Sequence, residues 1–230
     1  MADRVGVVIV GAGIGQRMGG IDKVFSPLVD RPIVSFSLDC FHQIRQVSEL
    51  VLVVERANIA KARDLIDSDY PDTNWKVCQG GETRQQSVSH GLQELGEVDW
   101  VVVHDAARPC LTVDLVNSGI ESAKLSNAAA PGVRLNDTIK IIDESDVVIT
   151  TLERTTLRAI QTPQVFKKQV LMEAHDQSCL IATDDAMLVE SLGYQVSVFA
   201  GSYDNIKLTT PEDLVLAEAI IRKNLFRKGI

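Results

Sequence analysis

The sequence predicts an α/β fold of one domain, residues 1–230, built on a mostly parallel sheet with helices on both faces. Four short apolar runs rich in β-branched residues predict strands that are buried on both faces: Val5–Val10, Leu50–Val54, Trp100–Val103 and Gln195–Phe199. Segments with helical spacing separate these runs. Strands that alternate with helices form βαβ units, and this order predicts the parallel sheet.

The helices are predicted from apolar spacing and from start signals. Two sets of apolar residues recur at helical intervals: Phe36, Cys40, Phe41, Ile44 and Val47 in the first, and Val88, Leu92 and Leu95 in the second. Thr210 and Pro211, followed by two acidic residues, have the composition of a helix N-terminus. The segment Thr183-Asp184-Asp185 is a similar helix opening.

One segment interrupts the alternation of strands and helices. Residues 137–152, DTIKIIDESDVVITTL, have the pattern of two strands around a polar DESD turn and predict an antiparallel hairpin. A hairpin inserted in an α/β chain usually covers a sheet edge or projects toward a partner subunit. We expect a projecting arm over residues 134–158 or nearly so.

Composition narrows the classes of function. The chain is 45% hydrophobic, enough for a sizeable core, and its net charge of −8 argues against nucleic acid, whose backbone needs a basic face. No apolar stretch approaches the roughly 20 residues of a membrane span, and the first strand begins without the pattern of a signal peptide. Four scattered cysteines fit a reducing compartment. We therefore expect a cytoplasmic protein that binds neither nucleic acid nor a membrane.

A glycine-rich loop follows the first strand: GAGIGQRMGGIDK, residues 11–23. Backbone N–H groups in such a turn approach phosphate oxygens without obstruction by Cβ atoms. The dinucleotide fingerprint G-x-G-x-x-G fails at Gln16, and the P-loop pattern fails because no lysine follows Gly20. The loop also contains Arg17 and Lys23, and two cations suit a nucleotide triphosphate better than the pyrophosphate of NAD.

Four more segments are expected at the carboxyl edge of the sheet, where open α/β sheets bind ligands. They are GGETRQQS (80–87), HDAARP (104–109), QTPQVF (161–166) and DNIKLTTPEDL (204–214). Asp105 follows the central strand, where a carboxylate can hold a metal ion or a ribose, and Arg108 can clamp a phosphate. Lys207 is predicted at the end of a strand. His104 is more typical of a packed core residue, and we assign it no role.

Together these segments closely resemble the 2-C-methyl-D-erythritol 4-phosphate cytidylyltransferases of the non-mevalonate isoprenoid pathway. The resemblance covers almost the whole chain, through GAGIGQRM, GGETRQQSV, HDAARP, NDTIK, QTPQVF, TDDA and YDNIKLTTPEDL in the family's order. It implies a Rossmann-like, glycosyltransferase-A-like nucleotidyltransferase fold whose hairpin arm joins two subunits in a homodimer. It also implies transfer of a cytidylyl group from CTP to methylerythritol phosphate, with Mg²⁺ as the metal and pyrophosphate as a product.

The resemblance implies roles for individual residues. The implied catalytic residues, which stabilise the triphosphate and the reacting α-phosphate, are Arg17, Lys23 and Lys207. The implied nucleotide-binding residues are Ala12, Gly13, Gly81, Ser87 and Asp105, and Asp105 is also the implied metal contact. The implied substrate-binding residues are Asp105, Arg108, Thr138, Arg154 and Thr162, with Thr138 and Arg154 reaching from the arm into the neighbouring subunit's site.

One position departs from the family pattern. Asp22 precedes the loop lysine where the family usually has proline, and Val24 follows it in place of glutamine. An acid beside Lys23 would weaken the attraction of the lysine for phosphate, or give the loop a different path.

Three other functions remain open from the sequence. A ribitol 5-phosphate cytidylyltransferase would share the fold and the chemistry, although HDAARP leans toward the methylerythritol enzymes. A nicotinamide or flavin oxidoreductase is disfavoured by the failed fingerprint and because no acid ends a second strand about 20 residues further on. Binding of NAD would revive it. A regulatory protein that binds a nucleotide without catalysis has only Asp22 in its favour, and turnover of CTP would exclude it.

Overall fold

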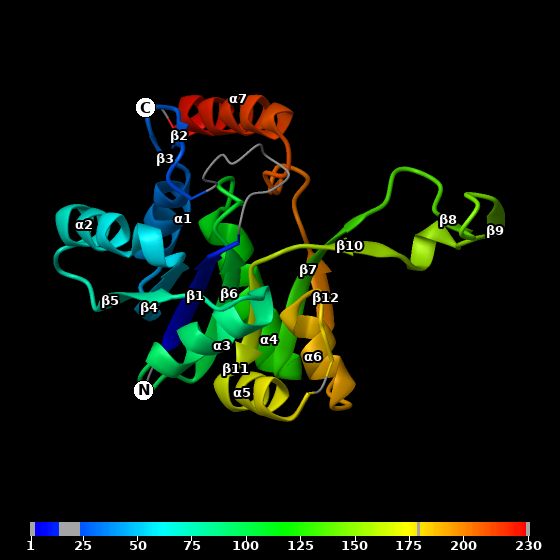
Figure 1. The fold of residues 1–230 in the computed structure, drawn as a ribbon, viewed down its shortest axis with the longest axis horizontal. Helices are drawn as coiled ribbons and strands as arrows, with labels where there is room; N and C mark the ends of the chain where they lie inside the picture. Colours follow the sequence, from blue (N-terminus) through cyan, green and yellow to red (C-terminus); the bar gives the residue numbers. More distant parts are fainter. Residues whose placement is uncertain (1–2, 14–23, 179, 229–230) are drawn as a thin grey trace.

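The structure, a computed structural model, describes residues 3–13, 24–178 and 180–228. Within them an eight-stranded sheet has the order β10-β7-β11-β6-β1-β4-β5, with β12 paired to β7 (Figure 1). Its strands are β1 (Val5–Gly11), β4 (Val47–Val54), β5 (Trp75–Gln79), β6 (Trp100–Asp105), β7 (Ala128–Arg134), β10 (Arg158–Ile160), β11 (Gln164–Lys167) and β12 (Ser197–Ala200). The pairs β1–β4, β1–β6, β4–β5 and β7–β12 are parallel, whereas β10 and β11 run antiparallel to their neighbours. The predicted α/β fold with a mostly parallel sheet is confirmed.

Helices cover both faces of this sheet, as predicted. One apolar cluster contains residues of α1 (Ile33–His42), α2 (Ile59–Asp69) and α4 (Val113–Ser126), and a second contains residues of α3 (Arg84–Glu94), α5 (Lys168–Gln177) and α6 (Asp185–Ser191). Strand β1 divides its side chains between the two: Val7 and Ile9 belong to the first cluster and Val8 to the second, and all three are fully buried. Because both faces of β1 are covered, its apolar run does not alternate with polar residues.

The predicted helix starts are present. Helix α7 (Pro211–Lys228) begins at the expected proline, and the carboxylate of Asp213 accepts a hydrogen bond of 2.8 Å from the backbone N–H of Thr210. Helix α6 begins after Asp184, whose side chain accepts from the backbone N–H of Met187 at 3.0 Å. Asp184 satisfies an N–H group that the first turn of its helix leaves unpaired, and Asp213 reaches back to the N–H group of the residue before its helix.

Two local predictions were wrong. Strand β12 begins at Ser197 and is not buried on both faces: its exposure alternates, and Val198 is 52% exposed because β12 lies beside the main path of the sheet. Val47 begins strand β4 instead of continuing helix α1, because the chain turns after the helix and the N–H of Val47 bonds to the carbonyl of Ile44 at 3.0 Å. The helical spacing of Ile44 therefore reflected its burial in the turn.

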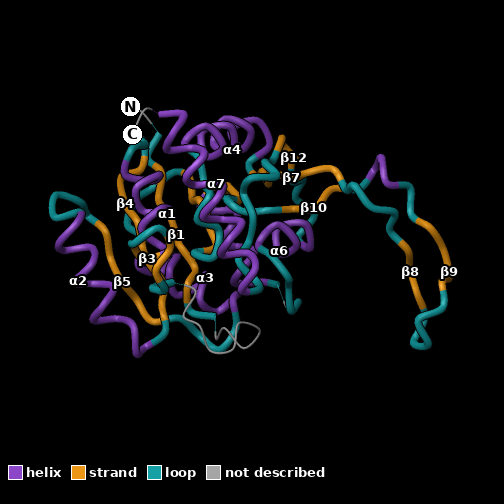
Figure 2. The backbone as a smooth tube through the Cα atoms, turned by 90° about the horizontal axis from the view of Figure 1, so that it is seen from above, coloured by secondary structure: helices purple, strands orange, loops and turns teal. Residues whose placement is uncertain are grey.

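The predicted hairpin is present and projects as an arm. Strands β8 (Lys140–Ile142) and β9 (Val148–Thr151) pair antiparallel, and Figures 1 and 2 show them extending well away from the sheet and its helices. The turn is closed by Asp143, whose carboxylate accepts from the N–H groups of Ser145 and Val147, each at 2.9 Å. The large apolar side chains exposed on this arm are Ile141, Ile142, Val147, Val148 and Ile149.

The smaller elements are β2 (Pro27–Leu28), β3 (Arg31–Pro32) and the 3₁₀ turns η2 (Arg56–Asn58) and η3 (Arg154–Thr156). Helix α7 packs in a third apolar cluster that also contains Leu28 of β2 and Leu208, in the loop that precedes the helix. In the part of the chain that the structure describes, no helix has the length and apolar composition that a membrane span requires.

Candidate active site

The loop after β1 and the turn before α3 meet at the carboxyl edge of the sheet. Strand β1 lies between β4 and β6, and its Val10 is in register with Asp105, the last residue of β6. Gly80 follows β5, and a Cβ atom at this position would lie 2.2 Å from the Cβ atom of Ala12. Atoms cannot approach so closely, so the contact between the two turns requires glycine at residue 80. Ala12, at the start of the first predicted glycine turn, and Gly80, in the second, therefore border one site.

The first turn of α3 is fixed by its own hydrogen bonds. Thr83 caps the helix and forms a reciprocal pair with Gln86, in which both hydrogen bonds measure 3.1 Å. Ser87 Oγ accepts from the backbone N–H of Gly81 at 3.1 Å and donates to the carbonyl of Thr83 at 2.9 Å. Gly81 and Ser87, both predicted to bind the nucleotide, thus lie together. Gly13, two residues beyond β1, is exposed.

Asp105 is bound by two cations. Its Oδ1 accepts from Nε of Arg84 at 3.1 Å, and its Oδ2 accepts from Nζ of Lys207 at 2.7 Å. Burial alone would raise the pKa of Asp105, but the charges of Arg84 and Lys207 outweigh burial and hold that pKa well below its usual range. The carboxyl group is therefore ionised at neutral pH, beside a lysine whose side chain is 44% exposed.

Lys207 reaches Asp105 from the loop between β12 and α7, and the prediction that it ends a strand was wrong. The loop is attached to the chain after β6 by a hydrogen bond of 2.8 Å from the N–H of Leu208 to the carbonyl of Ala107. The segment has the polar and β-branched composition of a strand end, but this backbone bond does not extend into a ladder. The loop nevertheless delivers the lysine to the edge of the sheet.

Arg84 is held on its other side by a buried carboxylate. Its Nη1 donates to Oδ2 of Asp185 at 2.7 Å, and Oδ1 of Asp185 lies 3.0 Å from Nε2 of His175. Burial opposes the ionisation of Asp185, yet Arg84 outweighs it and lowers the pKa of this carboxyl group. No role was predicted from the sequence for Arg84, Asp185 or His175. The motifs GGETRQQSV and TDDA contain the first two, and that was the signal available for finding them.

Thr162 and His104 belong to the hydrogen-bond network around Asp105. Thr162 Oγ1 accepts from the backbone N–H of Asp105 at 3.1 Å and lies 3.2 Å from Nδ1 of His104. Nε2 of His104 lies 3.2 Å from the carbonyl of Arg108, which places the ring proton on Nε2 and leaves Nδ1 to accept from the threonine. His104 is fully buried, as expected for a core residue. Thr162 is brought to Asp105 as predicted, with its hydroxyl engaged in internal hydrogen bonds.

Two arginines near Asp105 retain unused donors. Nη1 of Arg108 donates to the carbonyl of Asn205 at 2.8 Å. Nε of Arg108 and Nη2 of Arg84 are buried, and neither has a hydrogen-bond partner among the residues that the structure describes. Burial lowers the pKa of Arg108, which means that its charge is poorly solvated. A buried cationic donor without a partner is well placed to bind an anion.

The remaining predicted residues lie elsewhere. Thr138 and Arg154 are exposed on the arm, where Arg154 donates a hydrogen bond to the carbonyl of Asn136. Within the described ranges of this chain, no hydrogen bond connects either residue to the cluster around Asp105. Arg17 and Lys23, the two cations of the glycine loop, lie outside the described residues.

The described residues contain no group of three or more His, Cys, Asp or Glu side chains that could hold a metal ion. Asp105 is a single carboxylate whose two oxygens pair with Arg84 and Lys207. In proteins Mg²⁺ is commonly held by one or two carboxylates together with substrate phosphates. The donor set around Asp105 therefore fits a Mg²⁺ ion that is shared with a bound nucleotide.

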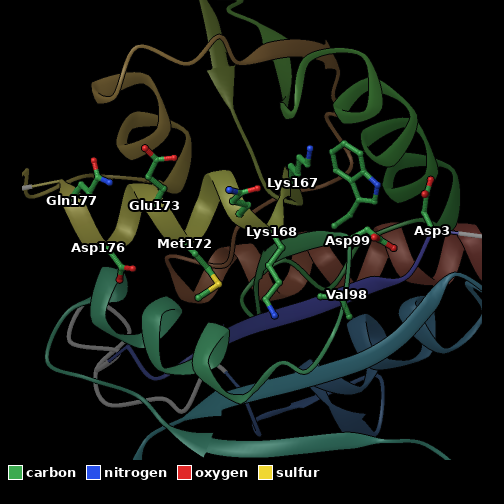
Figure 3. A pocket seen from close by; sticks show the side chains of 11 residues that line it. Asp3, Val98, Asp99, Lys167, Lys168, Met172, Glu173, Asp176 and Gln177 are labelled. Atoms are coloured by element: carbon green, nitrogen blue, oxygen red, sulfur yellow. The ribbon is translucent and has the colours of Figure 1, made fainter.

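A separate pocket of about 770 Å³ lies at the opposite edge of the sheet (Figure 3). Its lining includes Asp99 and Trp100, next to the start of β6, and Lys168 and Met172 of helix α5. Because Trp100 and Asp105 are the two ends of β6, the length of this strand separates the pocket from the candidate site. Side chains of both charges surround it, and we assign it no part in the reaction.

The comparisons with known proteins agree with this geometry. The profile of the 2-C-methyl-D-erythritol 4-phosphate cytidylyltransferase family matches residues 5–223. The chain is 43% identical over 221 residues to the protein of that name from Dehalococcoides mccartyi, covering 96% of this chain and 97% of the relative. It is 38% identical over 225 residues to the one from Caldanaerobacter subterraneus, covering 95% and 99%.

Solved structures give the same result. The 4-diphosphocytidyl-2C-methyl-D-erythritol synthase of Anaerococcus prevotii superposes with a TM-score of 0.85 at 29% identity, over 96% of this chain and 99% of the other. The 2-C-methyl-D-erythritol 4-phosphate cytidylyltransferase of Thermus thermophilus gives a TM-score of 0.77 at 33% identity, over 95% and 99%. On this similarity over nearly its whole length, the chain belongs to the 2-C-methyl-D-erythritol 4-phosphate cytidylyltransferase family.

Proposed function

We propose that this chain transfers the cytidylyl group of CTP to 2-C-methyl-D-erythritol 4-phosphate, a reaction of isoprenoid biosynthesis. The products are 4-diphosphocytidyl-2-C-methyl-D-erythritol and pyrophosphate. One observation carries the proposal: the Asp105–Lys207 pair, 2.7 Å apart, lies at the sheet edge bordered by two glycine turns, in a chain that matches the family over residues 5–223.

The reaction needs positioning and charge neutralisation more than it needs acid–base chemistry. The phosphate of the second substrate attacks the α-phosphorus of CTP in line, and pyrophosphate leaves. A phosphate monoester carries about −1.5 to −2 charges at pH 7, so no side chain has to remove a proton from it. We assign Lys207 to the α-phosphate because its side chain is 44% exposed and can leave Asp105 for a more highly charged partner. Arg17 and Lys23 are assigned to the triphosphate on the family resemblance.

The nucleotide is assigned to the two glycine turns. Backbone groups of the turns that meet at Ala12 and Gly80 are assigned to the base, where a snug fit would select a pyrimidine over the larger purine. The residues assigned to cytosine, ribose and phosphate are Ala12, Gly13, Gly81, Ser87 and Asp105. The N-terminus of α3 lies beside them and adds N–H groups that favour an anion.

We also propose that Mg²⁺ takes part and that Asp105 holds it together with the phosphates of CTP. A bound Mg²⁺ ion neutralises the charge that accumulates on the phosphate oxygens during transfer. Arg84 keeps one oxygen of Asp105 occupied, so the other oxygen, which accepts from Lys207, is the one available to the ion. Arg108, with a buried donor that lacks a partner among the described residues, is assigned to the phosphate of the second substrate.

We further propose a homodimer formed through the arm. The arm exposes five large apolar side chains, Ile141, Ile142, Val147, Val148 and Ile149, and a projecting hairpin of this kind is stabilised when a second chain covers them. Thr138 and Arg154, exposed on the arm, are then available to the substrate in the neighbouring subunit's site. In that arrangement the dimer is required for catalysis as well as for stability.

The first experiment measures pyrophosphate release from CTP and Mg²⁺ with 2-C-methyl-D-erythritol 4-phosphate or with ribitol 5-phosphate. We expect release with the methylerythritol compound. Lys207→Gln should lower kcat by at least 100-fold, whereas Lys223→Gln, which removes a 50% exposed lysine of α7, should leave kcat unchanged. Release with ribitol 5-phosphate alone would keep the chemistry and reject the substrate. If a folded dimer releases no pyrophosphate with either compound, the proposal is rejected.

A further inference from the structure

Five charged or polar side chains form a continuous chain of contacts behind the candidate site. Lys207 pairs with Oδ2 of Asp105 at 2.7 Å, and Arg84 pairs with Oδ1 of Asp105 at 3.1 Å. Arg84 also pairs with Asp185 at 2.7 Å, and Asp185 with His175 at 3.0 Å. Two of these residues, Asp185 and His175, have no place in the function proposed above.

Exposure is lowest at the Asp185 and His175 end of this chain of contacts and highest at Lys207. The side chains of Asp185 and His175 are 1% and 3% exposed, Asp105 is 9% exposed, Arg84 is 26% exposed and Lys207 is 44% exposed. A buried carboxylate that loses its partner becomes strongly destabilising, so Asp185 holds Arg84 firmly. An exposed lysine is screened by water, so Lys207 is exchanged easily. The chain of contacts is therefore fixed at Asp185 and adaptable at Lys207.

The orientation of Arg84 depends on this anchor. Nε of Arg84 donates to one oxygen of Asp105, and Nη1 donates to Asp185. Nη2 is buried and has no hydrogen-bond partner in the described part of the chain. An arginine with one carboxylate partner prefers a bidentate arrangement, in which two N–H groups bind both oxygens. Arg84 makes a single hydrogen bond to Asp105, and the second oxygen accepts from Lys207 instead.

We propose that Asp185 is a positioning residue: by holding Nη1 of Arg84, it prevents bidentate pairing of Arg84 with Asp105 and keeps Oδ2 of Asp105 for Lys207. His175 fixes the carboxylate of Asp185 from the opposite side. When Lys207 moves to a phosphate, Asp105 keeps Arg84 as a partner and its charge stays compensated. The inference rests on the role of Lys207 in the proposed function.

The guanidinium group is essential to this arrangement. Its planar fork lets Nε and Nη1 bind two carboxylates at once in fixed directions, and the single ammonium group of a lysine cannot do this. Arg84→Lys therefore keeps the charge between Asp105 and Asp185 and removes the geometry. A role limited to balancing charge would tolerate this substitution, whereas a positioning role would not.

The test compares kcat and KM for CTP in four proteins: wild type, Asp185→Asn, Lys207→Gln and the double variant. Transfer is followed with α-labelled CTP so that slow variants remain measurable. Glu190→Gln is the matched control because it neutralises an exposed carboxylate on the same helix α6. Thermal unfolding of each protein fixes an assay temperature at which it is fully folded.

We expect Asp185→Asn to lower kcat by about 10- to 100-fold, the usual effect of losing a residue that orients a catalytic group. The KM for CTP should change by less than about threefold, because the side chain of Asp185 pairs with Arg84 and His175 and, among the described residues, not with the two glycine turns. Glu190→Gln should match the wild type. In the Lys207→Gln background, adding Asp185→Asn should lower kcat by less than about threefold, because the group that Asp185 positions is already gone.

The other outcomes separate a failure of this inference from a failure of the proposed function. If the two single effects multiply in the double variant, Asp185 does not act through Lys207, and the proposed function stands without it. If Lys207→Gln is as fast as the wild type, the role of Lys207 and this inference fail together. If Asp185→Asn does not fold, Arg84→Lys decides: a loss of at least tenfold in kcat supports positioning, and wild-type kcat rejects it.

Discussion

Burial of His104 makes the stability of this fold depend on pH. The ring is fully buried, with Nε2 directed to the carbonyl of Arg108 and Nδ1 to the hydroxyl of Thr162. Burial lowers the pKa of His104 from 6.5 to about 4. The negative charge of Asp105 and the hydrogen bond to the carbonyl of Arg108 oppose this shift, and the positive charges of Arg108 and Arg84 assist it. The folded protein therefore keeps this ring neutral under conditions in which an unfolded chain would protonate it.

The sign and size of the effect follow from these two pKa values. Above pH 6.5 the ring is neutral in both states, and His104 adds no pH dependence. Between pH 6.5 and 4 the unfolded state binds the proton more tightly, so the free energy of unfolding falls as the pH is lowered. With about 1.4 kcal/mol for each pKa unit, the loss reaches about 2 kcal/mol at pH 5 and about 3 kcal/mol at pH 4.

The assay is urea unfolding of the wild type and of His104→Gln, followed by circular dichroism from pH 7.5 to 4.5. Glutamine does not titrate, so the stability advantage of the wild type over the variant should shrink by about 2 kcal/mol between pH 7 and pH 5. His90→Gln removes an exposed ring on α3 and serves as the control for the loss of a histidine. An advantage of the wild type over His104→Gln that is equal at pH 7 and pH 5 would refute the reasoning.

Three further predictions concern the two glycine turns, the arm and the last helix. Gly80→Ala places a methyl group 2.2 Å from Cβ of Ala12, so it should weaken CTP binding at least tenfold in calorimetry, and an unchanged affinity would mean that the turns separate freely. Ile149→Glu puts a charge on an arm side chain that is 64% exposed, and it should convert the proposed dimer to monomer in sedimentation experiments; a persistent dimer would locate the interface elsewhere. Asp213→Ala removes the carboxylate that accepts from the backbone N–H of Thr210 at 2.8 Å, and it should lower the free energy of unfolding by about 1 kcal/mol in urea, where no change would contradict its capping role.

Much of the fold could be predicted because it depends on local pattern. The apolar run of β1 implied a strand covered on both faces, and the residues around Pro211 gave the start of α7. The polar DESD turn between two β-branched segments gave the hairpin. The prediction of a strand buried on both faces was wrong at β12, whose side chains are alternately more and less exposed. Exposure depends on which elements lie beside a strand, and the apolar composition of the strand does not give this.

The motifs predicted which residues lie at the site, but not which of their side chains pair with each other. The glycine turns and Asp105 were expected at the carboxyl edge of the sheet because parallel strands share that edge. From the sequence, Gly80 was only the first residue of a glycine turn, and the structure shows that its lack of a Cβ atom permits contact with Ala12. The roles assigned to Thr138 and Arg154 remain predictions, since they concern a second chain.

By itself the sequence determined the alternation of strands and helices, the arm, the glycine turns and the resemblance to a family of cytidylyltransferases. Only the tertiary structure decided which charges meet. Lys207 is 102 residues from Asp105, and Arg84 is 101 residues from Asp185, yet both pairs are 2.7 Å apart. Local propensity carries no information about such contacts, because they form when loops and helix ends are brought together by the packing of the whole sheet.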